Sequence, residues 1–307
     1  MILTELTADE VEARFSEAGL EPFRARQVLA WMYKHRAPDF GRMTDLSREL
    51  RDVLTREFRL YGAAVATRRL AADGTEKLLL RLADGNVIET VMIPEGRRIT
   101  ACISTQVGCP VACVFCASGL DGLKRNLTAG EIVEQILLLP KRPTHVVIMG
   151  IGEPLLNFTP LVAALRTMRE AVGIGYNKIT LSTAGVVDKI PELVKARATP
   201  NLAISLHAPD DALREKLVPG LSRWKIADLV AAGRAYREET GKDVTFEYVL
   251  LAGVNDAPEQ ATVLARRLRG ASVKVNVIPF NGVPVTVRRQ RGDDASAACG
   301  QLRAAFS

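Results

Sequence analysis

Long apolar runs are missing from this chain of 307 residues, and none approaches the length that crosses a bilayer. The N-terminal segment MILTELTADEVEARF also lacks the basic start and apolar stretch of a secretory signal peptide. Internal repeats and low-complexity segments are absent as well. These absences predict a cytoplasmic globular protein with no membrane association, and a composition that is 48% hydrophobic and 25% charged agrees with it.

Cysteine and histidine are scarce, with five and three residues respectively. An odd number of cysteines in a reducing compartment argues against a disulfide framework and favours metal binding or catalysis. Four of the cysteines lie close together in the sequence, at Cys102, Cys109, Cys113 and Cys116, whereas Cys299 stands far away near the C-terminal end.

The formal net charge is +6. Such an excess fits a polyanionic partner such as nucleic acid, although charge alone equally describes a basic soluble protein. A group of basic residues in the N-terminal segment would contact RNA phosphates, or would simply form a solvated helix face; its members are Arg24, Arg26, Lys34, His35, Arg36 and Arg42.

Three regions differ in the period of their apolar residues. Residues 1–60 have helical spacing, and Thr7 with Glu10 forms a capping box. Residues 61–98 contain two Asp-Gly turns between β-rich runs, which predicts a three-stranded meander. In residues 99–307, short apolar strands alternate with amphipathic helices, and we place the strands at 101–105, 144–149, 178–183, 201–206, 244–250 and 273–279. Six such units predict an α/β fold with an open, partial (β/α)6 barrel.

The motif that carries chemistry is Cys109-Pro-Val-Ala-Cys113-Val-Phe-Cys116. Iron–sulfur clusters are held by cysteine thiolates, and three ligands on a [4Fe–4S] cluster leave one iron open for a substrate. A zinc site is the alternative, but structural zinc usually has pairs of cysteines two residues apart and four ligands in all. The position directly after the first barrel strand favours the cluster.

A second motif, Met149-Gly-Ile-Gly-Glu-Pro154, follows the second strand of the barrel. Its glycines allow a ligand to approach the backbone, and Glu153 can accept a hydrogen bond from an ammonium group. Alone, the motif could be any turn. Its place after a cysteine loop and one β/α unit favours a binding site.

Taken in order, several stretches resemble the RlmN/Cfr family of radical S-adenosylmethionine (SAM) RNA methyltransferases, most of all its RlmN branch. The resemblance covers nearly the whole chain and rests on PFRARQVLAWMY, ETVMIPE, ACISTQVGCPVACVFCASG, LKRNLTAGEIVEQI, MGIGEPLLNF, ITLSTAGVV, NLAISLHAP, VNVIPFN and VRRQRGDDASAACGQL. It implies a radical SAM partial barrel with a small N-terminal helical and β-meander accessory domain.

The resemblance also implies the cofactors and the chemistry. A [4Fe–4S] cluster on Cys109, Cys113 and Cys116 and two molecules of SAM per turnover would convert adenosine to 2-methyladenosine. Cys299 would carry the methyl group first, and Cys102 would release the RNA by forming a disulfide with Cys299. Without the resemblance, both would be ordinary buried thiols.

Other site residues follow from the same resemblance. Glu89 would act as the proton acceptor, although alone it would be a solvated strand carboxylate. Phe115 would shield the cluster or stack on adenine, unless it only packs. Contacts to SAM are implied for Gly152, Glu153, Ser182, Ser205, Leu206, His207 and Asn281. The implied partners are 23S rRNA, tRNA for some members, and a one-electron reductant such as flavodoxin. The enzyme itself is expected to be a monomer.

The chain departs from the family after Asn281, where Gly282 to Arg288 follows in place of a loop and helix. The family also carries a longer basic tail than the residues after Cys299. Two other functions therefore stay open. One is methylation at C8 of adenosine, as in the Cfr branch, and the other is a degenerate iron–sulfur RNA-binding protein without turnover.

Overall fold

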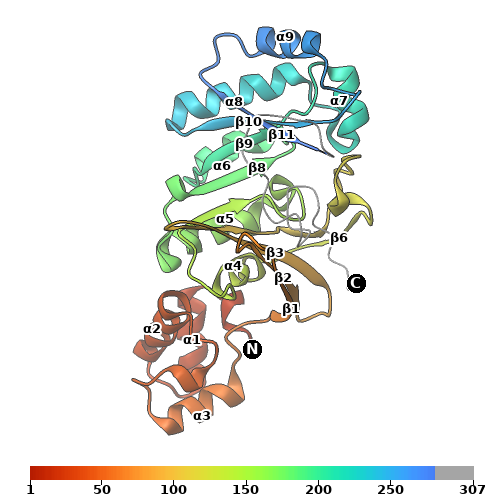
Figure 1. Cartoon of the computed structure of the whole chain (residues 1–307). Coiled ribbons are helices and arrows are strands. Elements are labelled where there is room, and N and C mark those ends of the chain that lie inside the picture. The colour runs from red at the N-terminus through yellow and green to blue at the C-terminus, as the bar shows by residue number, and fades with distance from the viewer. Residues whose placement is uncertain (281–307) are drawn as a thin grey trace.

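The computed structural model describes residues 1–280, and all structural statements refer to that range (Figure 1). Its N-terminal region consists of helices α1 (Ala8–Glu17), α2 (Pro22–Ala30) and α3 (Arg48–Glu57), which lie together at one end of an elongated molecule. The predicted capping box at the start of α1 is present, since the Thr7 hydroxyl accepts from Glu10 N and the Glu10 carboxylate accepts from Thr7 N.

The predicted meander consists of β1 (Ala64–Leu70), β2 (Glu76–Arg81) and β3 (Val87–Glu95), paired antiparallel. Gly74 and Gly85 have φ of 82° and 86°, so both predicted Asp-Gly turns use the left-handed region that glycine tolerates. The meander does not stand apart from the barrel. Strand β3 also pairs antiparallel with β4 (Arg98–Cys102), so the meander continues the barrel sheet.

The main sheet within residues 1–280 has nine strands in the order β1-β2-β3-β4-β7-β8-β9-β10-β11. From β4 onward every neighbouring pair is parallel, which confirms the partial barrel of six strands. The remaining bounds are β7 (His145–Ile148), β8 (Ile179–Thr183), β9 (Asn201–Ser205), β10 (Val244–Leu250) and β11 (Lys274–Pro279). A small second sheet pairs β5 (Gln106–Gly108) with β6 (Leu123–Asn126), and it was not predicted from the sequence.

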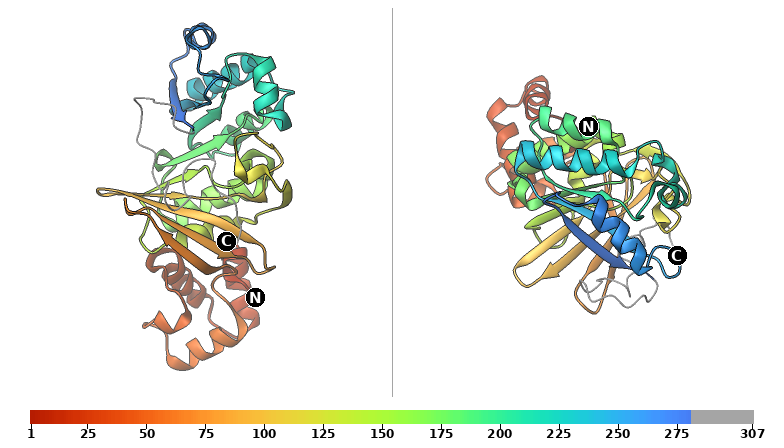
Figure 2. Two further views of the ribbon diagram at one scale, coloured as in Figure 1. Left: turned by 45° about the vertical axis from the view of Figure 1, so that its right-hand side comes forward. Right: turned by 90° about the horizontal axis from the view of Figure 1, so that it is seen from above.

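Crossover helices connect the parallel strands, and Figure 2 shows those coloured green and cyan along one side of the strands. Their bounds are α4 (Ala129–Leu137), α5 (Phe158–Thr167), α6 (Ile190–Lys195), α7 (Asp211–Leu217), α8 (Ile226–Thr240) and α9 (Pro258–Arg267). None of the described helices combines the length and the apolar character that a membrane span needs. The short helical segments are η1 (Leu3–Glu5), η2 (Trp31–His35), η3 (Phe40–Arg42), η4 (Ala117–Gly119), η5 (Pro154–Asn157), η6 (Met168–Val172), η7 (Tyr176–Lys178), η8 (Val187–Lys189) and η9 (Pro219–Leu221).

The two faces of the sheet have different surroundings. On β2 to β4, one face contributes Leu78, Ile88 and Ala101 to the large hydrophobic core. Side chains alternate along a strand, so the neighbouring residues point to the opposite face. There Val91 and Cys102 form a separate small apolar cluster with Ala71 and Ile151. The sheet thus divides a helix-covered core from a second face, on which Cys102 lies.

Helix α4 holds the N-terminal helices against the barrel. The carboxylate of Glu134 in α4 is fully buried and accepts hydrogen bonds from Gly62 N at 2.7 Å, from Ala63 N at 2.6 Å and from the Thr4 hydroxyl. The Arg36 guanidinium donates to the carbonyl groups of Leu137, the last residue of α4, and of Leu139 beyond its end. These polar contacts are called the junction below.

Candidate active site at the carboxyl ends of the strands

The cysteine loop runs between β5 and β6 and is folded back on itself. Gly108 precedes it with φ of 77°, and a Cβ there would lie 1.9 Å from the carbonyl oxygen of Gly122, so no other residue fits without backbone movement. Cys109 N donates to that same Gly122 carbonyl at 3.0 Å, and Cys116 N donates to Cys113 O at 3.0 Å. The ribbon therefore fixes both ends of the cysteine loop.

The middle of the cysteine loop is attached to the segment after α7. Val114 N donates to Leu217 O at 3.1 Å, and Gly220 N donates to Val111 O at 3.0 Å. A Cβ on Gly220 would come within 2.7 Å of the Val111 Cα atom, so this close approach needs glycine. The loop is consequently held from two sides, by the β5–β6 ribbon and by α7.

The three thiols of the loop are free and half-buried. Burial raises the pKa of Cys109 to about 11. It also raises the pKa of Cys113, and the charges of Cys116 and Cys109 raise it further. No three acidic, histidine or cysteine side chains in residues 1–280 already stand in metal-binding geometry. The donor set itself fits an iron–sulfur cluster, because three thiols on one loop are one ligand short of structural zinc.

Glu153 lies in the loop after β7 and is only 2% exposed. Gly152 before it has φ of 112°, and a Cβ there would lie 2.7 Å from the Gln106 side chain. The Gln106 amide oxygen in turn accepts from Glu153 N at 2.8 Å. The motif Gly-Glu-Pro is therefore packed directly against β5, the strand that leads into the cysteine loop.

The Glu153 carboxylate connects two strand ends. It accepts hydrogen bonds from the Thr183 hydroxyl at 2.8 Å, from Ala184 N at 2.6 Å and from Leu155 N at 3.0 Å. Burial nevertheless raises its pKa to about 7. A carboxylate has about four acceptor positions, so one is left for a ligand such as an ammonium group.

His207 follows β9 and stands in the left-handed region with φ of 59°. Its Nδ1 accepts from Val249 N at 3.0 Å, so the proton of the neutral ring is on Nε2. Burial lowers its pKa to about 3, which keeps the ring neutral. Its ring meets the edge of Phe115 with centroids 4.9 Å apart, and this contact brings the cysteine loop to the end of β9.

Of the other residues expected to contact SAM, Ser182 and Ser205 are half-buried near the carboxyl ends of β8 and β9. Leu206 is fully buried, and its N–H donates to Glu247 O at 2.9 Å. Asn281 lies outside the described residues. The expected set is therefore found at three adjacent strand ends, as far as the structure describes it.

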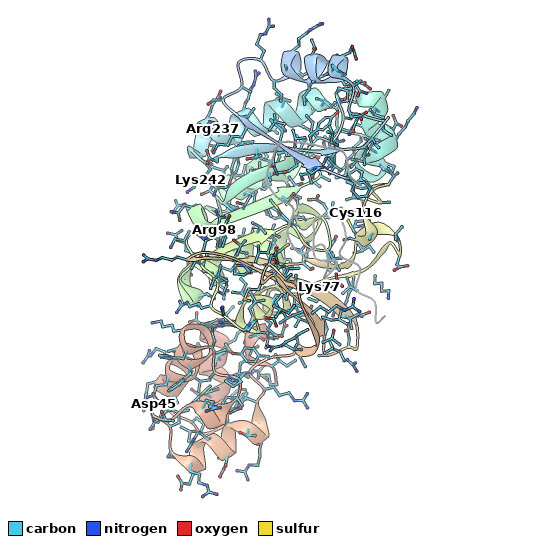
Figure 3. The ribbon with its side chains drawn as sticks, viewed as in Figure 1. Asp45, Lys77, Arg98, Cys116, Arg237 and Lys242 are labelled. Atoms are coloured by element: carbon cyan, nitrogen blue, oxygen red, sulfur yellow. The ribbon has the colours of Figure 1, made fainter. Side chains whose placement is uncertain are left out.

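Cys102 and Glu89 come together on neighbouring strands. Cys102 pairs with Val91, and Glu89 is two residues from Val91, so both side chains belong to the same face of the sheet. Glu89 is 2% exposed, and its Oε1 lies 3.0 Å from Nζ of Lys77 on β2. Figure 3 labels Lys77 on the meander and Cys116 on the cysteine loop. Cys299 lies outside the described residues, and the four described cysteines are free thiols.

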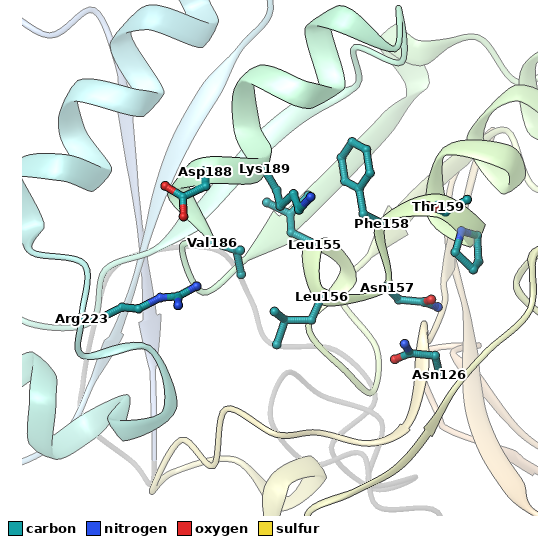
Figure 4. A pocket seen from close by; sticks show the side chains of 11 residues that line it. Asn126, Leu155, Leu156, Asn157, Phe158, Thr159, Val186, Asp188, Lys189 and Arg223 are labelled. Atoms are coloured by element: carbon teal, nitrogen blue, oxygen red, sulfur yellow. The ribbon is translucent and has the colours of Figure 1, made fainter.

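An open hollow of about 410 Å³ adjoins η5, the segment directly after Glu153. Lys189 and Arg223 reach it from two different segments, and Leu156 and Asp188 also line it (Figure 4). Lys189 and Arg223 are both exposed. The hollow thus places the cations of Lys189 and Arg223 beside the candidate site, and the carboxylate of Asp188 partly offsets their charge.

The basic N-terminal residues do not form one free surface. Arg36 is engaged at the junction, and Arg26 lies 3.5 Å from Glu12. Arg24 stacks over the Phe23 ring at 4.5 Å. Arg36 is therefore not available for the expected RNA contacts on this face. Exposed residues such as Lys34 and Arg42 remain available for them.

Sequence reasoning missed several polar residues of the site. Glu247 is the one charged residue in the apolar strand VTFEYVL, and its carboxylate accepts from the Asn276 amide at 2.6 Å, so that pattern could have revealed it. Lys77 had a weaker signal, a cation in an otherwise buried stretch of β2. Arg214 had none, since DALREKL resembles an ordinary surface helix.

The fold and the cysteine loop define a class. A family model described as "Radical SAM superfamily" matches residues 103–264, and one described as "Ribosomal RNA large subunit methyltransferase N-terminal domain" matches residues 1–60. The chain is a radical SAM enzyme, and that membership implies an iron–sulfur cluster and SAM as cofactors.

Relatives make the assignment narrower. A protein named probable dual-specificity RNA methyltransferase RlmN from Rhodopirellula baltica is 42% identical, over 98% of this chain and 90% of the relative. One of the same name from Thermosynechococcus vestitus is 41% identical over 99% of both chains. The crystal structure of a radical SAM methyltransferase from Sphaerobacter thermophilus superposes with a TM-score of 0.93 at 42% identity, covering 99% of this chain and 100% of that one. The chain belongs to the RlmN family of radical SAM RNA methyltransferases.

Proposed function

We propose that this enzyme converts adenosine to 2-methyladenosine in 23S rRNA, and in tRNA as the dual specificity in its relatives' names suggests. The observation that carries the proposal is that the side chains of Glu89 and Cys102 lie on the same face of the sheet. Cys102 packs there with Ile151, the residue before Gly152 and Glu153. A thiol and a carboxylate thus stand together beside the strand end that leads to the proposed SAM site.

The roles of the residues follow from this placement. Cys109, Cys113 and Cys116 would hold the cluster, which with SAM supplies radical chemistry when bound. Glu153 and the end of β9 at His207 would orient SAM at the carboxyl ends of the strands, where β/α folds build their sites. Glu153 and His207 are both buried, so bulk water has little access to them.

The thiols and Glu89 would complete the reaction. Cys299 would take the methyl group from one SAM and give up its thiol proton. That methyl group would lose one hydrogen atom to the radical chemistry that the cofactors supply, and its carbon would then bond to the adenine ring with loss of one electron, which divides a difficult methylation into feasible steps. Glu89 accepts the proton that leaves the adenine ring. The Cys102 thiolate would then attack the Cys299 sulfur, so that a disulfide forms as the sulfur–carbon bond to the RNA breaks. The carbon keeps the electron pair of that bond and takes up a proton, which gives the methyl group of the product.

Nucleoside mass spectrometry tests the product. Reconstituted enzyme, a one-electron reductant such as flavodoxin, SAM with a labelled methyl group and an rRNA fragment should yield labelled 2-methyladenosine. Labelled 8-methyladenosine would assign the chain to the other branch of the chemistry. A chain with full iron but without any labelled nucleoside would be a degenerate RNA-binding protein.

Two variants test the thiol roles. Cys299→Ala should abolish both protein methylation and the RNA product. Cys102→Ala should leave Cys299 methylated and should accumulate a covalent protein–RNA adduct, visible as a shifted band that nuclease removes. Methylation of RNA by Cys299→Ala would contradict the mechanism while leaving the radical SAM assignment intact.

RNA would approach over the hollow beside η5. Lys189 and Arg223 are exposed there and can contact phosphates, which contribute affinity without reading sequence. Replacing both by Ala should weaken RNA binding and reduce the slope of log K against log salt by about two. Lys195→Ala is the matched control, because this exposed lysine already pairs with Glu192. Equal salt slopes for all three proteins would exclude the hollow as the RNA surface.

A further inference from the structure

Arg214 in α7 is a buried cation to which the proposed function assigns no role. It is 1% exposed and is among the largest fully buried side chains of the described chain. Its guanidinium donates to the carbonyl oxygens of Ala184 at 2.5 Å, Leu221 at 3.3 Å and Trp224 at 3.4 Å. Within residues 1–280, its Nε–H group has no hydrogen-bond partner.

A buried guanidinium bound only by neutral carbonyl groups is expensive, because desolvation of the charge is only partly offset. Burial accordingly lowers the pKa of Arg214, whereas attraction to Cys113 and, less strongly, to Asp211 raises it. Asp211 is already engaged, since its carboxylate accepts from Ile226 N at 2.7 Å. The cysteine loop is the other neighbour, because α7 binds it directly: Leu217 O accepts from Val114 N, the residue after Cys113. Cys113 would become an anion as a cluster thiolate, and Arg214 is placed to balance that charge.

Arg214 also links two binding segments of the site, the one at Glu153 and the cysteine loop. The Ala184 peptide that accepts from Arg214 donates its own N–H to the Glu153 carboxylate. Leu217, one helical turn beyond Arg214, accepts from Val114 N in the cysteine loop. The charge reaches His207 as well, since Arg214 lowers the pKa of that ring. One side chain therefore touches or influences both binding segments.

We propose that Arg214 is the resident countercation of the iron–sulfur site. In this role Arg214 holds the cysteine loop in place and favours the reduced state of the cluster. The inference rests on the proposed role of Cys113 as a ligand. A cluster held by three thiolates gains one negative charge when a one-electron reductant reduces it. A fixed cation in a low-dielectric site stabilises the more negative state, and net charge is one of the factors that set cluster potentials.

A redox titration tests this. Arg214→Met removes the charge at similar length, and Arg214→Lys keeps it. In anaerobically reconstituted protein with SAM absent, Arg214→Met should show about tenfold less reduced cluster at a fixed potential, a shift of about 59 mV to more negative values. Arg214→Lys should stay within about twofold of the unaltered chain by this relation. Arg223→Met, an exposed arginine nearby, is the matched control and should not shift.

The outcome with full iron in every variant decides the proposal. An unchanged midpoint in Arg214→Met would overturn it and would leave the proposed RNA chemistry standing. If Arg214→Met shows the expected shift of the midpoint but the unaltered chain yields no methylated RNA, the role of Arg214 would stand and the proposed RNA chemistry would fall. If the unaltered chain takes up stoichiometric zinc in place of iron, both proposals fall.

A measurement on the unaltered chain covers the case in which Arg214→Met does not fold. In protein labelled with ¹⁵N-arginine, the Nε–H signal of Arg214 can be assigned by its absence from Arg214→Lys. Cluster loading followed by one-electron reduction should shift and broaden that signal, because the reduced cluster is paramagnetic and the proposal places it close to Arg214, while the signal of Arg223 stays in place. A signal that does not respond to loading would exclude Arg214 as the countercation.

Discussion

The junction and the strand-end site both bury charged side chains, but they do so in different ways. At the junction, Glu134 and Arg36 each bind backbone groups of the facing segment. At the strand ends, three thiols, Glu153, His207 and Arg214 converge from four segments of the chain, and most have shifted pKa values. Burial also shifts the pKa values of Glu134 and Arg36, so a shifted pKa alone does not separate the two regions. The strand ends are marked as the functional site because chemically reactive groups converge there from several segments.

The largest expected effect breaks the strand-end site and spares the junction. Cys113→Ala should lose the cluster completely, because two remaining thiols on the loop cannot hold it. Iron content and visible absorption after anaerobic reconstitution measure the loss. Cys102→Ala is the control, since this thiol lies on the sheet face and should leave the iron content unchanged. Full iron in Cys113→Ala would mean that the cysteine loop is not the metal site.

The next effect breaks the junction and spares the site. Glu134→Leu removes the acceptor of three hydrogen bonds and leaves the N–H groups of Gly62 and Ala63 buried. Each unsatisfied buried donor costs about 1–3 kcal/mol, so the free energy of unfolding should fall by roughly 3 kcal/mol. Urea denaturation measures the change. The exposed Glu238→Leu should stay within about 0.5 kcal/mol of the unaltered chain.

Arg36→Met should have a smaller effect of the same kind. The guanidinium donates to two carbonyl groups at the C-terminal end of α4, and loss of these hydrogen bonds should lower the free energy of unfolding by about 1–3 kcal/mol in urea denaturation. Arg24→Met provides the comparison, because Arg24 only stacks over Phe23 and donates to Gln27 within its own helix. Equal stability of the two variants would show that Arg36 does not fasten the N-terminal helices to the barrel.

Local signals predicted much of this fold. The capping box at Thr7, the two Asp-Gly turns and the six barrel strands each depend on a few adjacent residues, so the sequence displays them directly. The pairing of β3 with β4 and the β5–β6 ribbon were missed. The ribbon strands have three and four residues, too short for an alternating pattern to develop.

The site divides in the same way. The cysteine loop and the Gly-Glu-Pro motif are contiguous in sequence and could be predicted, although the partners of Glu153 at Thr183 and Ala184 could not. Arg214 could not be predicted because its surroundings arise from carbonyl groups of two separate segments, one at Ala184 and one at Leu221 and Trp224. Contacts of this kind depend on long-range packing, which no window of the sequence contains.

The smallest effect concerns the pH dependence of the junction. Burial raises the pKa of Glu134 above its usual value, so the folded chain holds this proton more tightly than the unfolded chain. The stability that Glu134 contributes is therefore greatest below its unfolded pKa, and it decreases as the pH rises through the folded pKa. Glu134→Gln removes this titration. The stability of the unaltered chain minus that of Glu134→Gln should decrease from about pH 4 upward and then level off.

Glu10 gives a control with the opposite sign. This exposed carboxylate accepts from the backbone and hydroxyl of Thr7, and these hydrogen bonds lower its pKa. Its contribution is present above the unfolded pKa and is lost as the pH falls through the folded one, so the corresponding difference for Glu10→Gln should increase with pH over the acidic range. Opposite slopes of the two stability differences against pH would show that burial dominates the pKa shift of Glu134 and that hydrogen bonding dominates the shift of Glu10. Parallel slopes would mean that Glu134 is solvated in the folded chain and that the junction is more open than its hydrogen bonds indicate.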